Sequence, residues 1–355
     1  MKSLVVGQAE IDEIVRAVGH DELMSRIIER LFTGLAAAGL TDQQSPPRGG
    51  FTRGETATGV LEWMPFHEPG RGVTIKTVAY SPANPTEFQL PTILGNVARY
   101  DDVTGRLVAI MDAVLLTAMR TGAASAVASR LLANPRSRVV GMVGAGAQAI
   151  TQVHALSRVF DLREVLVWDT TPAHLESFAA RVAFTGLDVR AATTEELFAR
   201  ADIICTATSS PRGHGPVLPE RGHREHLHIN AVGSDLAGKT ELPKGLLDRA
   251  FVCPDHLEQA SREGECQQMG GRNPGPGLAE LCADPAQAVA YQSQLTVFDS
   301  TGIAVEDHLA LDVFLELAEE FGLGNQIQLE YHPTDTLNPY ANLLAPGPAA
   351  SVRAH

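Results

Sequence analysis

Arg138-Val-Val-Gly-Met-Val-Gly-Ala-Gly-Ala-Gln-Ala149 is the stretch that decides the fold of this chain. Its β-branched half predicts a strand, and its small-residue half predicts a glycine turn that opens a helix. A helix that begins in this way presents its first backbone amides to a pyrophosphate. The spacing of Gly144, Gly146 and Ala149 therefore indicates a dinucleotide site, although a chain with 32 glycines also produces such spacings by chance.

A second apolar run, residues 165–168, ends in Asp169. This acid follows the turn at roughly the 20 to 25 residues typical of ribose-binding carboxylates. It would accept hydrogen bonds from the adenosine ribose hydroxyls and repel a 2'-phosphate. We therefore expect the cofactor to be NAD rather than NADP; the alternative is a merely structural strand, turn and helix.

Composition limits the partners of the chain. With 355 residues, 44% hydrophobic and 20% charged, it is an ordinary globular chain of about two domains. A net charge of -14 without a basic block argues against nucleic acid and anionic membranes. We see no run long enough for a signal peptide or a membrane span, and expect a cytoplasmic protein whose partners are small molecules or a second copy.

The residue types that bind metals do not form a convincing set. The cysteines lie far apart, without zinc-ligand spacing, and we expect them to be reduced packing residues. They are Cys205, Cys253, Cys266 and Cys282. The histidines at 223, 226 and 228 look like a metal tract, but a structural site normally needs four ligands. We expect no metal, and interpret His223, His226 and His228 as a surface turn with titrating histidines.

Periodicity divides the chain into two parts. Helical spacing over 10–18 and 21–32 gives way to a loop at 43–50 and then to strands at 59–64, 73–80 and 107–112. An alanine-rich helix over 113–132 should connect the parts and pack closely against a neighbouring backbone. From Arg138 strands and helices alternate, which predicts a mostly parallel sheet with helices on both faces. An amphipathic helix over 304–321 should return to the first part, and the tail from Pro333 should be loose or surface-bound.

Four motifs together resemble the ornithine cyclodeaminase and mu-crystallin family over about residues 45–325. They are Arg120-Thr-Gly-Ala-Ala-Ser-Ala, Val143-Gly-Ala-Gly-Ala-Gln-Ala, Asn230-Ala-Val-Gly-Ser-Asp-Leu-Ala-Gly-Lys-Thr-Glu-Leu and Thr296-Val-Phe-Asp-Ser-Thr-Gly-Ile-Ala-Val-Glu-Asp. Two more, Gly59-Val-Leu-Glu-Trp-Met-Pro and Ile75-Lys-Thr-Val-Ala-Tyr-Ser-Pro-Ala-Asn, resemble the lysine cyclodeaminases that form L-pipecolate.

The resemblance implies an α/β fold with two domains. A Rossmann-type NAD-binding domain would span 129–304, and a discontinuous α+β domain for substrate binding and dimerisation would span 1–128 and 305–355. The implied activity converts L-lysine to L-pipecolate and ammonia. Hydride leaves Cα for bound NAD, the terminal amine attacks, ammonia departs and hydride returns, so there is no net redox change.

Four charged residues from both parts of the chain suggest how a substrate would be held. Asp235 follows a strand at the sheet edge where ligands bind, and would take a proton from an ammonium or merely cap a helix. The guanidinium of Arg120 suits a carboxylate, although it can also be a solvated helix charge. Lys76 faces either water or a site, and Glu62 is either a site residue or an exposed strand charge.

By resemblance, Asp235 is catalytic, and Arg120 and Lys76 bind the substrate carboxylate with a third arginine. That arginine is Arg48 or Arg53, and we favour Arg48. Glu62 matches an acidic position that holds water or the terminal amine. By resemblance, the cofactor contacts include Gly144, Gly146, Asp169 and Arg120. The other implied contacts are Thr92, Ala147, Gln148, Thr208, Ala231, Val232, Lys239, Ser300 and Thr301.

Three other functions stay open at this point. Ornithine cyclodeamination to L-proline differs by one methylene, which changes affinity by only about 1 to 3 kcal/mol. A ketimine reductase would consume external NAD(P)H, and Asp169 argues against NADPH. A non-catalytic crystallin-like binding protein would be expected to lack Asp235 or the glycine turn, and both are present.

Overall fold

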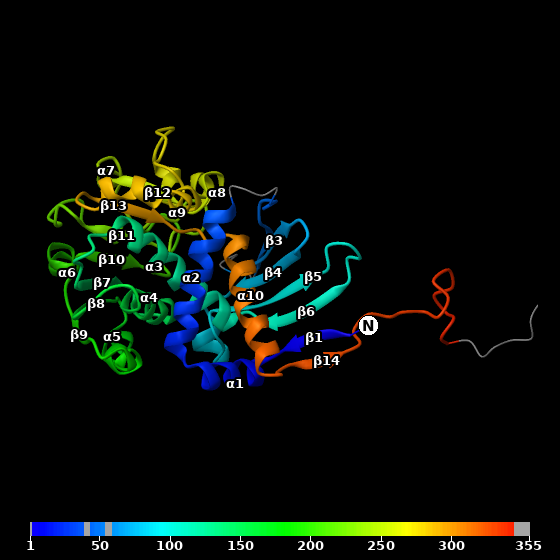
Figure 1. Ribbon diagram of the computed structural model, residues 1–355. Helices are drawn as coiled ribbons and strands as arrows, with labels where there is room; N and C mark the ends of the chain where they lie inside the picture. The colour runs from blue at the N-terminus through cyan, green and yellow to red at the C-terminus, as the bar shows by residue number, and fades with distance from the viewer. Residues whose placement is uncertain (1, 39–42, 54–58, 344–355) are drawn as a thin grey trace, which may run out of the picture.

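The computed structural model describes residues 2–38, 43–53 and 59–343, which form two sheets and the helices around them (Figure 1). The first sheet has the strand order β14-β1-β6-β5-β4-β3-β2 and the second has the order β12-β13-β11-β10-β7-β8-β9. The chain thus has the predicted mixture of an α+β part and an α/β part.

The first sheet is antiparallel except for the parallel pair β1 and β6. Its strands are β1 Ser3–Val6, β2 Gly49–Arg53, β3 Gly59–Glu68, β4 Gly72–Tyr80, β5 Ile93–Tyr100, β6 Leu107–Asp112 and β14 Asn325–Ile327. The helices on one side of it are α1 Gln8–Val18, α2 His20–Ala38 and α10 Ala304–Glu320, and a short η1 Asn84–Phe88 follows β4 (Figure 1). Strands β2 and β5 were not predicted, because Gly49-Gly50 and Gly95-Asn96 look like loop residues rather than strand residues.

The second sheet is entirely parallel. Its strands are β7 Val139–Val143, β8 Glu164–Trp168, β9 Asp188–Ala191, β10 Ile203–Thr206, β11 His228–Ala231, β12 Phe251–Pro254 and β13 Thr296–Asp299. Its helical segments are α4 Ala147–Ser157, α5 Pro172–Arg181, η2 Ala183–Thr185, α6 Thr194–Arg200, α7 Lys244–Leu247, α8 Leu257–Glu263, η3 Glu265–Gln268, α9 Leu278–Ala283 and η4 Pro285–Tyr291. The strand order reverses at β7, so the glycine turn lies at the switch point where such sheets bind ligands.

Helix α3, Val114–Leu132, is the predicted connection between the two sheets. It lies against α4, and Gly122 is where the two backbones meet. A Cβ at Gly122 would stand 2.4 Å from the carbonyl oxygen of Thr151. The close packing expected from the small residues of α3 is therefore confirmed, and it requires glycine at this position.

The helix predicted over 304–321 is present as α10, but the prediction that one of its faces is polar and exposed was wrong for its first three turns. The residues of α10 are buried from Ala304 to Phe314 without interruption, because α2, α3, β3 and β4 all pack against it. Its acids are therefore not a solvated face. Glu306, Asp307 and Asp312 are buried and pair with cations of neighbouring elements.

The histidine tract was also partly misinterpreted. His228 begins β11 and is fully buried, with its ring nitrogens 2.8 Å from Thr296 Oγ1 and 3.2 Å from Asn230 Oδ1. Burial lowers the pKa of His228 to about 4, so this ring stays neutral at physiological pH. His223 and His226 are partly exposed, as a surface turn requires, and His226 pairs with Asp202.

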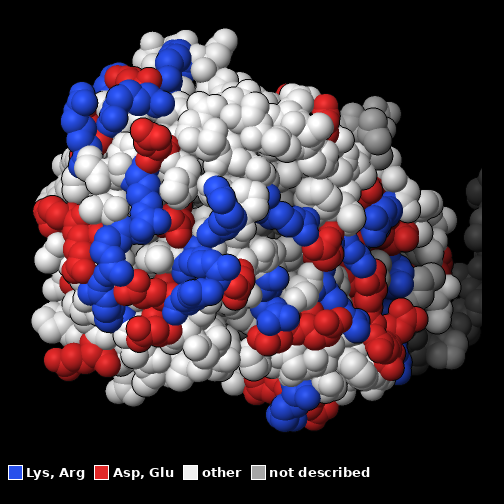
Figure 2. Space-filling model, turned by 60° about the vertical axis from the view of Figure 1, so that its left-hand side comes forward, with Lys and Arg blue, Asp and Glu red and all other residues white. Residues whose placement is uncertain are grey.

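The cysteines are free thiols in the protein interior, as predicted. Figure 2 shows a face of the molecule on which basic and acidic side chains are interspersed. Ion pairs between partly exposed side chains include Arg190 with Glu164 and Glu196. Within residues 2–38, 43–53 and 59–343, no helix has the length and apolar character needed to cross a membrane.

Candidate active site

The glycine turn after β7 has the geometry of a nucleotide cradle. Gly144 has φ +97°, and a Cβ there would lie 2.5 Å from the carbonyl oxygen of Ala207, so only glycine fits. Gly146 precedes the first turn of α4 and faces open space: no atom lies within 4 Å of where its Cβ would be. The backbone amides of that first turn are thus open to an anionic ligand.

Asp169 holds this turn in place from the end of β8. Its carboxylate accepts the backbone N–H groups of Ala145 and Thr171, both at 2.7 Å. The N–H of Gly144 donates to the carbonyl of Trp168 at 2.8 Å. Each carboxylate oxygen has a second lone pair, so the acid can still accept a ribose hydroxyl.

A cavity of about 580 Å³ opens in front of the turn. Gly144, Gly146, Asp169 and Thr208 line it, together with Trp168 and the loop at Ser209–Pro211 among others. The open space at Gly146 leaves room for a pyrophosphate at the amides of α4. The carboxylate of Asp169 in the cavity wall suits a ribose without a 2'-phosphate. The residues present therefore fit NAD.

A second cavity lies between the two sheets and is lined by charged residues. These residues are Arg48, Glu62, Lys76, Arg120 and Asp235. The remaining wall is largely apolar and comes from Val60, Met64, Val78, Ile93 and Leu236, with Tyr80, Thr117 and Thr301. All five residues predicted to bind or transform the substrate therefore meet in this cavity, which is named the substrate cavity below after that prediction.

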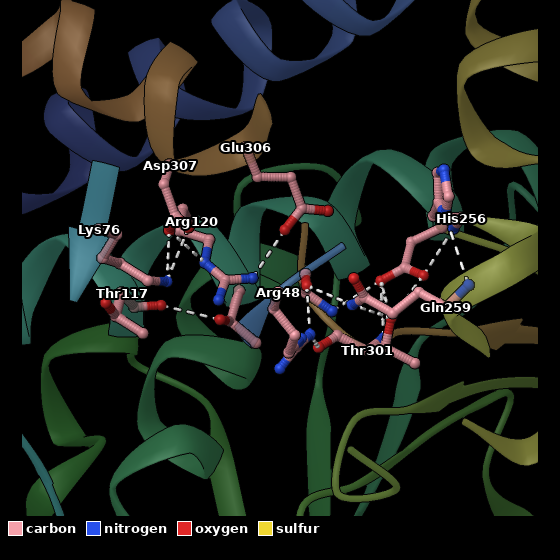
Figure 3. Close-up of polar contacts among 12 residues, drawn as sticks. Arg48, Lys76, Thr117, Arg120, His256, Gln259, Thr301, Glu306 and Asp307 are labelled. Carbon is pink, nitrogen blue, oxygen red and sulfur yellow. Dashed lines mark hydrogen bonds and ion pairs between the residues drawn. The ribbon is translucent and has the colours of Figure 1, made fainter. Parts of the chain in front are cut away.

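Lys76 and Arg120 are held by the first turn of α10 (Figure 3). Lys76 points inward from β4, only 1% exposed, with Nζ 2.7 Å from both carboxylate oxygens of Asp307. Arg120, from α3, places Nη1 2.7 Å from Glu306 Oε2 and Nε 3.1 Å from Asp307 Oδ1. The two acids also lie at the N-terminal end of a helix, where negative charge is favoured.

Burial changes the protonation of this cluster. It lowers the pKa of Lys76 to about 8, partly opposed by Asp307. Burial raises the pKa of Glu306 to about 7 against the attraction of Arg120. For Arg120, burial alone would lower the pKa, but Asp307 and Glu306 raise it instead. Arg120 therefore stays charged, whereas Lys76 can lose its proton in mildly alkaline solution.

The structure places Arg48, and not Arg53, in the substrate cavity. Arg48 Nη2 donates to the carbonyls of Thr301 and Gly302, both at 2.7 Å, from across the cavity (Figure 3). Arg53 instead donates to Ser81 Oγ at 2.6 Å and does not line this cavity. Arg48 thus lies with the other candidates in this cavity, and its binding of a carboxylate stays a prediction.

Two acids flank Arg48, and one of them was not predicted. Arg48 Nη1 lies 3.5 Å from Glu62 Oε2, and Nε lies 3.1 Å from Glu263 Oε1. Burial raises the pKa of Glu263, with Arg48 opposing and Glu62 adding to the shift. Glu263 ends α8, outside the motifs that carried the family resemblance, so no sequence signal marked it.

Asp235 stands at the mouth of the substrate cavity, in the loop after β11. Its side chain is 46% exposed and lies 3.3 Å from Nζ of Lys239. Burial would lower the pKa of Lys239, but Asp235 and Glu241 raise it. Lys239 was predicted to contact the cofactor, and here its ammonium serves as the partner of Asp235.

Glu241 joins the two cavities and was not predicted as a site residue. Its carboxylate is fully buried and accepts Thr206 Oγ1 (2.6 Å), Thr208 N (2.8 Å), Thr208 Oγ1 (2.6 Å) and Gly233 N (2.9 Å). A Cβ at Gly233 would stand 2.3 Å from Glu241 Oε1, so glycine is required there. One side chain thus fixes the wall of the nucleotide cavity and the start of the Asp235 loop.

The other predicted cofactor residues lie at strand ends or in the first turn of α4. Ala147 and Gln148 begin α4, and Thr92 precedes β5. Val232 follows β11, and Ala231, which ends it, packs into the core and accepts the N–H of Ser300 at 3.0 Å. Thr301 is held by Asp255, which accepts both its N–H and its hydroxyl. Of these residues only Thr301 lines a described cavity.

Comparison with known proteins agrees with this geometry. The profile of the ornithine cyclodeaminase/mu-crystallin family matches residues 10–321. An L-lysine cyclodeaminase of Streptomyces rapamycinicus is 51% identical over 342 residues, which are 96% of this chain and 100% of the relative.

Solved structures extend the comparison. One, described as the structural basis for recognition of L-lysine, L-ornithine and L-2,4-diaminobutyric acid by lysine cyclodeaminase, superposes with a TM-score of 0.93 at 61% identity and covers 96% of this chain and 99% of that one. An archaeal alanine dehydrogenase dimer with bound NAD has a TM-score of 0.81 at 30% identity, over 93% and 100% of the two chains. The chain belongs to the ornithine cyclodeaminase/mu-crystallin family.

Proposed function

We propose that the protein is an NAD-dependent lysine cyclodeaminase that converts L-lysine into L-pipecolate and ammonia. The observation that carries this proposal is a cavity in which Arg48, Lys76 and Arg120 meet Asp235 and Glu62 beside the nucleotide cradle. The half-identical Streptomyces relative is a lysine cyclodeaminase, which supports the same substrate.

The cofactor would be held by Gly144, Gly146 and the first turn of α4, with Asp169 toward the ribose. When bound, NAD accepts hydride from the substrate and returns it within one turnover, which matches a conversion without net oxidation. We keep Thr92, Thr208, Val232, Lys239, Ser300 and Thr301 as proposed contacts around it, with Ala147, Gln148 and Ala231 contributing backbone.

Lys76, Arg120 and Arg48 would bind the α-carboxylate of the substrate. The ammonium of Lys76 donates to Asp307, and because it has three N–H donors it can also donate to a ligand. Arg120 has five donors, and its bonds to Glu306 and Asp307 hold the guanidinium plane in place. The buried acids of α10 thus offset part of the cost of burying the charges of Lys76 and Arg120, and hold both side chains in place.

Asp235 would act as the base. The substrate must lose an ammonium proton both before oxidation at Cα and before ring closure, and a carboxylate at the cavity mouth can take it. The neighbouring Lys239 donates from Nζ to Asp235 Oδ1 at 3.3 Å. Glu62 would hold the terminal amine or a water molecule at the other end, near the apolar wall of Val60 and Ile93 that suits a methylene chain.

L-Ornithine is the nearest alternative substrate. The structure at 61% identity is described as recognising L-ornithine and L-2,4-diaminobutyric acid besides L-lysine. We expect lysine to be preferred here, and ornithine to give L-proline by the same steps.

We further propose a cytoplasmic homodimer whose α+β domain, 1–128 with 305–355, carries the interface and whose NAD-binding domain spans 129–304. Residues 1, 39–42, 54–58 and 344–355 of these ranges lie outside the described residues. The outer face of the first sheet exposes part of Leu61, Trp63, Ile75 and Ile110, an apolar surface suited to a second copy. The buried free cysteines fit a reducing compartment.

The test is to incubate the purified protein with L-lysine, and separately with L-ornithine, without added cofactor. Ammonia and L-pipecolate should appear in equal amounts, with no accumulation of NADH. Activity that needs added NADPH and a cyclic imine would instead identify a ketimine reductase. Denaturation of the purified protein should release NAD, which mass spectrometry of the supernatant detects.

A further inference from the structure

The C-terminal arm, residues 331–343, stands clear of the subunit that carries it (Figure 1). The chain leaves the first sheet after β14 and is anchored by Glu330, whose Oε1 accepts the N–H of Leu107 at 2.9 Å. Beyond this anchor no residue of the arm is buried. The arm is thus presented to the surroundings rather than to its own core.

The arm nevertheless has an internal structure. Asn342 closes it, because its Oδ1 accepts the N–H of Thr334 and its Nδ2 donates to the carbonyl of His332. Three backbone turn bonds also form within it: the N–H groups of Asn338, Ala341 and Leu343 donate to the carbonyls of Asp335, Asn338 and Tyr340, respectively. The hydrogen bonds described for residues 331–343 all close within this segment.

The exposed side chains of this segment are unusually apolar. Tyr331 is 54% exposed, Leu337 92%, Tyr340 63% and Leu343 71%, and Leu329 just before the arm is 50% exposed. A preorganised loop that offers two tyrosines and two leucines to solvent is typical of an anchor for another protein surface. Tyrosine in particular gives contact area at a low entropic cost.

We propose that the arm packs onto a second copy of this chain, as a clasp of the homodimer. The inference rests on the homodimer proposed above. It commits to a second copy because the arm grows from the edge of the sheet whose outer apolar face, with Leu61, Trp63 and Ile110, is itself only partly covered. In a two-fold dimer the contact is reciprocal, so each subunit both gives and receives an arm.

The proposal predicts a large effect from two side chains. The double substitution Leu337→Ser with Tyr340→Ser should raise the dimer dissociation constant at least tenfold in sedimentation over a dilution series. Val289→Ser removes a side chain of similar exposure, 63%, from η4 on the second sheet and should leave the constant unchanged. Truncation after Glu330 should match or exceed the double variant.

A photo-crosslinking residue at position 337 gives a second reading that does not depend on stability. In a mixture of tagged and untagged chains it should join two different chains. Cross-links only within one chain, or a double variant that dissociates like the wild type, would overturn the arm contact. Pipecolate formation is measured in parallel, so loss of the proposed activity and loss of the clasp are separate results.

Discussion

The nucleotide cavity and the substrate cavity are built in opposite ways. The first is centred on a backbone turn and the acid that holds it, Gly144 to Asp169, and loops after neighbouring strands complete its wall. The second is made of charged side chains from separate segments, held by acids that lie far away in the sequence. We therefore expect the nucleotide site to depend mainly on its local turn, and the substrate site to depend on partners that are distant in the sequence.

The sharpest test of that difference is Asp235→Asn. Turnover should fall by about 10² to 10⁴-fold, because the base is lost, while NAD content and melting temperature stay at wild-type values. The measurements are ammonia release and NAD extracted per chain. Asp161→Asn, at an exposed ion pair with Arg138, is the matched control. Unchanged ammonia release would remove Asp235 from its proposed role.

Asp307→Asn should break the substrate site through its support. Lys76 and Arg120 would lose a shared buried partner, which typically costs about 3 to 5 kcal/mol. The melting temperature should drop, and lysine binding should weaken in titration calorimetry. Asp248→Asn removes an exposed partner of Lys244 and should change neither. An unaltered melting temperature for Asp307→Asn would mean that the two cations do not depend on α10.

Gly146→Val addresses the other cavity. The position has φ -79° and open space around it, so valine can be accommodated without strain in the fold. Its side chain would stand between the helix amides and the pyrophosphate, and losing one or two bonds to a charged group costs about 1.5 to 3 kcal/mol each. NAD affinity should fall by about tenfold or more, with an unchanged melting temperature of the nucleotide-free protein. Full NAD retention would mean that the turn is not the cradle.

The smallest effect expected is on pH. Lys76 is protonated and attracts a carboxylate below its pKa of about 8, and becomes neutral above it. Binding of L-pipecolate to the NAD-loaded protein should therefore weaken by up to about tenfold between pH 7 and pH 9. Lys76→Met should bind weakly at both pH values. Wild-type binding that is constant over this range would show that bound NAD or the ligand keeps Lys76 charged.

The features that could be predicted from the sequence are those that depend on local contacts, and most of them lie in the nucleotide site. The glycine turn, Asp169 and the parallel sheet were predictable because each depends on neighbours in the chain. Lys76, Arg120 and Asp235 could be named as candidates from charge and motif. Their partners could not, because Glu306 and Asp307 follow a pattern typical of a polar helix face, and only the packing of α10 between other elements buries them.

The missed strands have a related cause. β2 begins with Gly49-Gly50, where a Cβ at Gly50 would lie 2.5 Å from the carbonyl oxygen of Leu61. In sequence terms such glycines indicate a loop, whereas here they allow a neighbouring strand to approach. The buried His228 was misjudged for the same reason, since its neighbours in space, Thr296 and Asn230, decide its state.

We expect Glu241 to link ligand binding in the two cavities thermodynamically. Because one carboxylate fixes both Thr208 and Gly233, any ligand that orders one loop lowers the entropic cost of ordering the other. By reciprocity, NAD would then tighten substrate binding by the factor with which substrate tightens NAD binding. Such mutual tightening suits a cofactor that must stay in place for many turnovers, since each new substrate molecule also slows its escape.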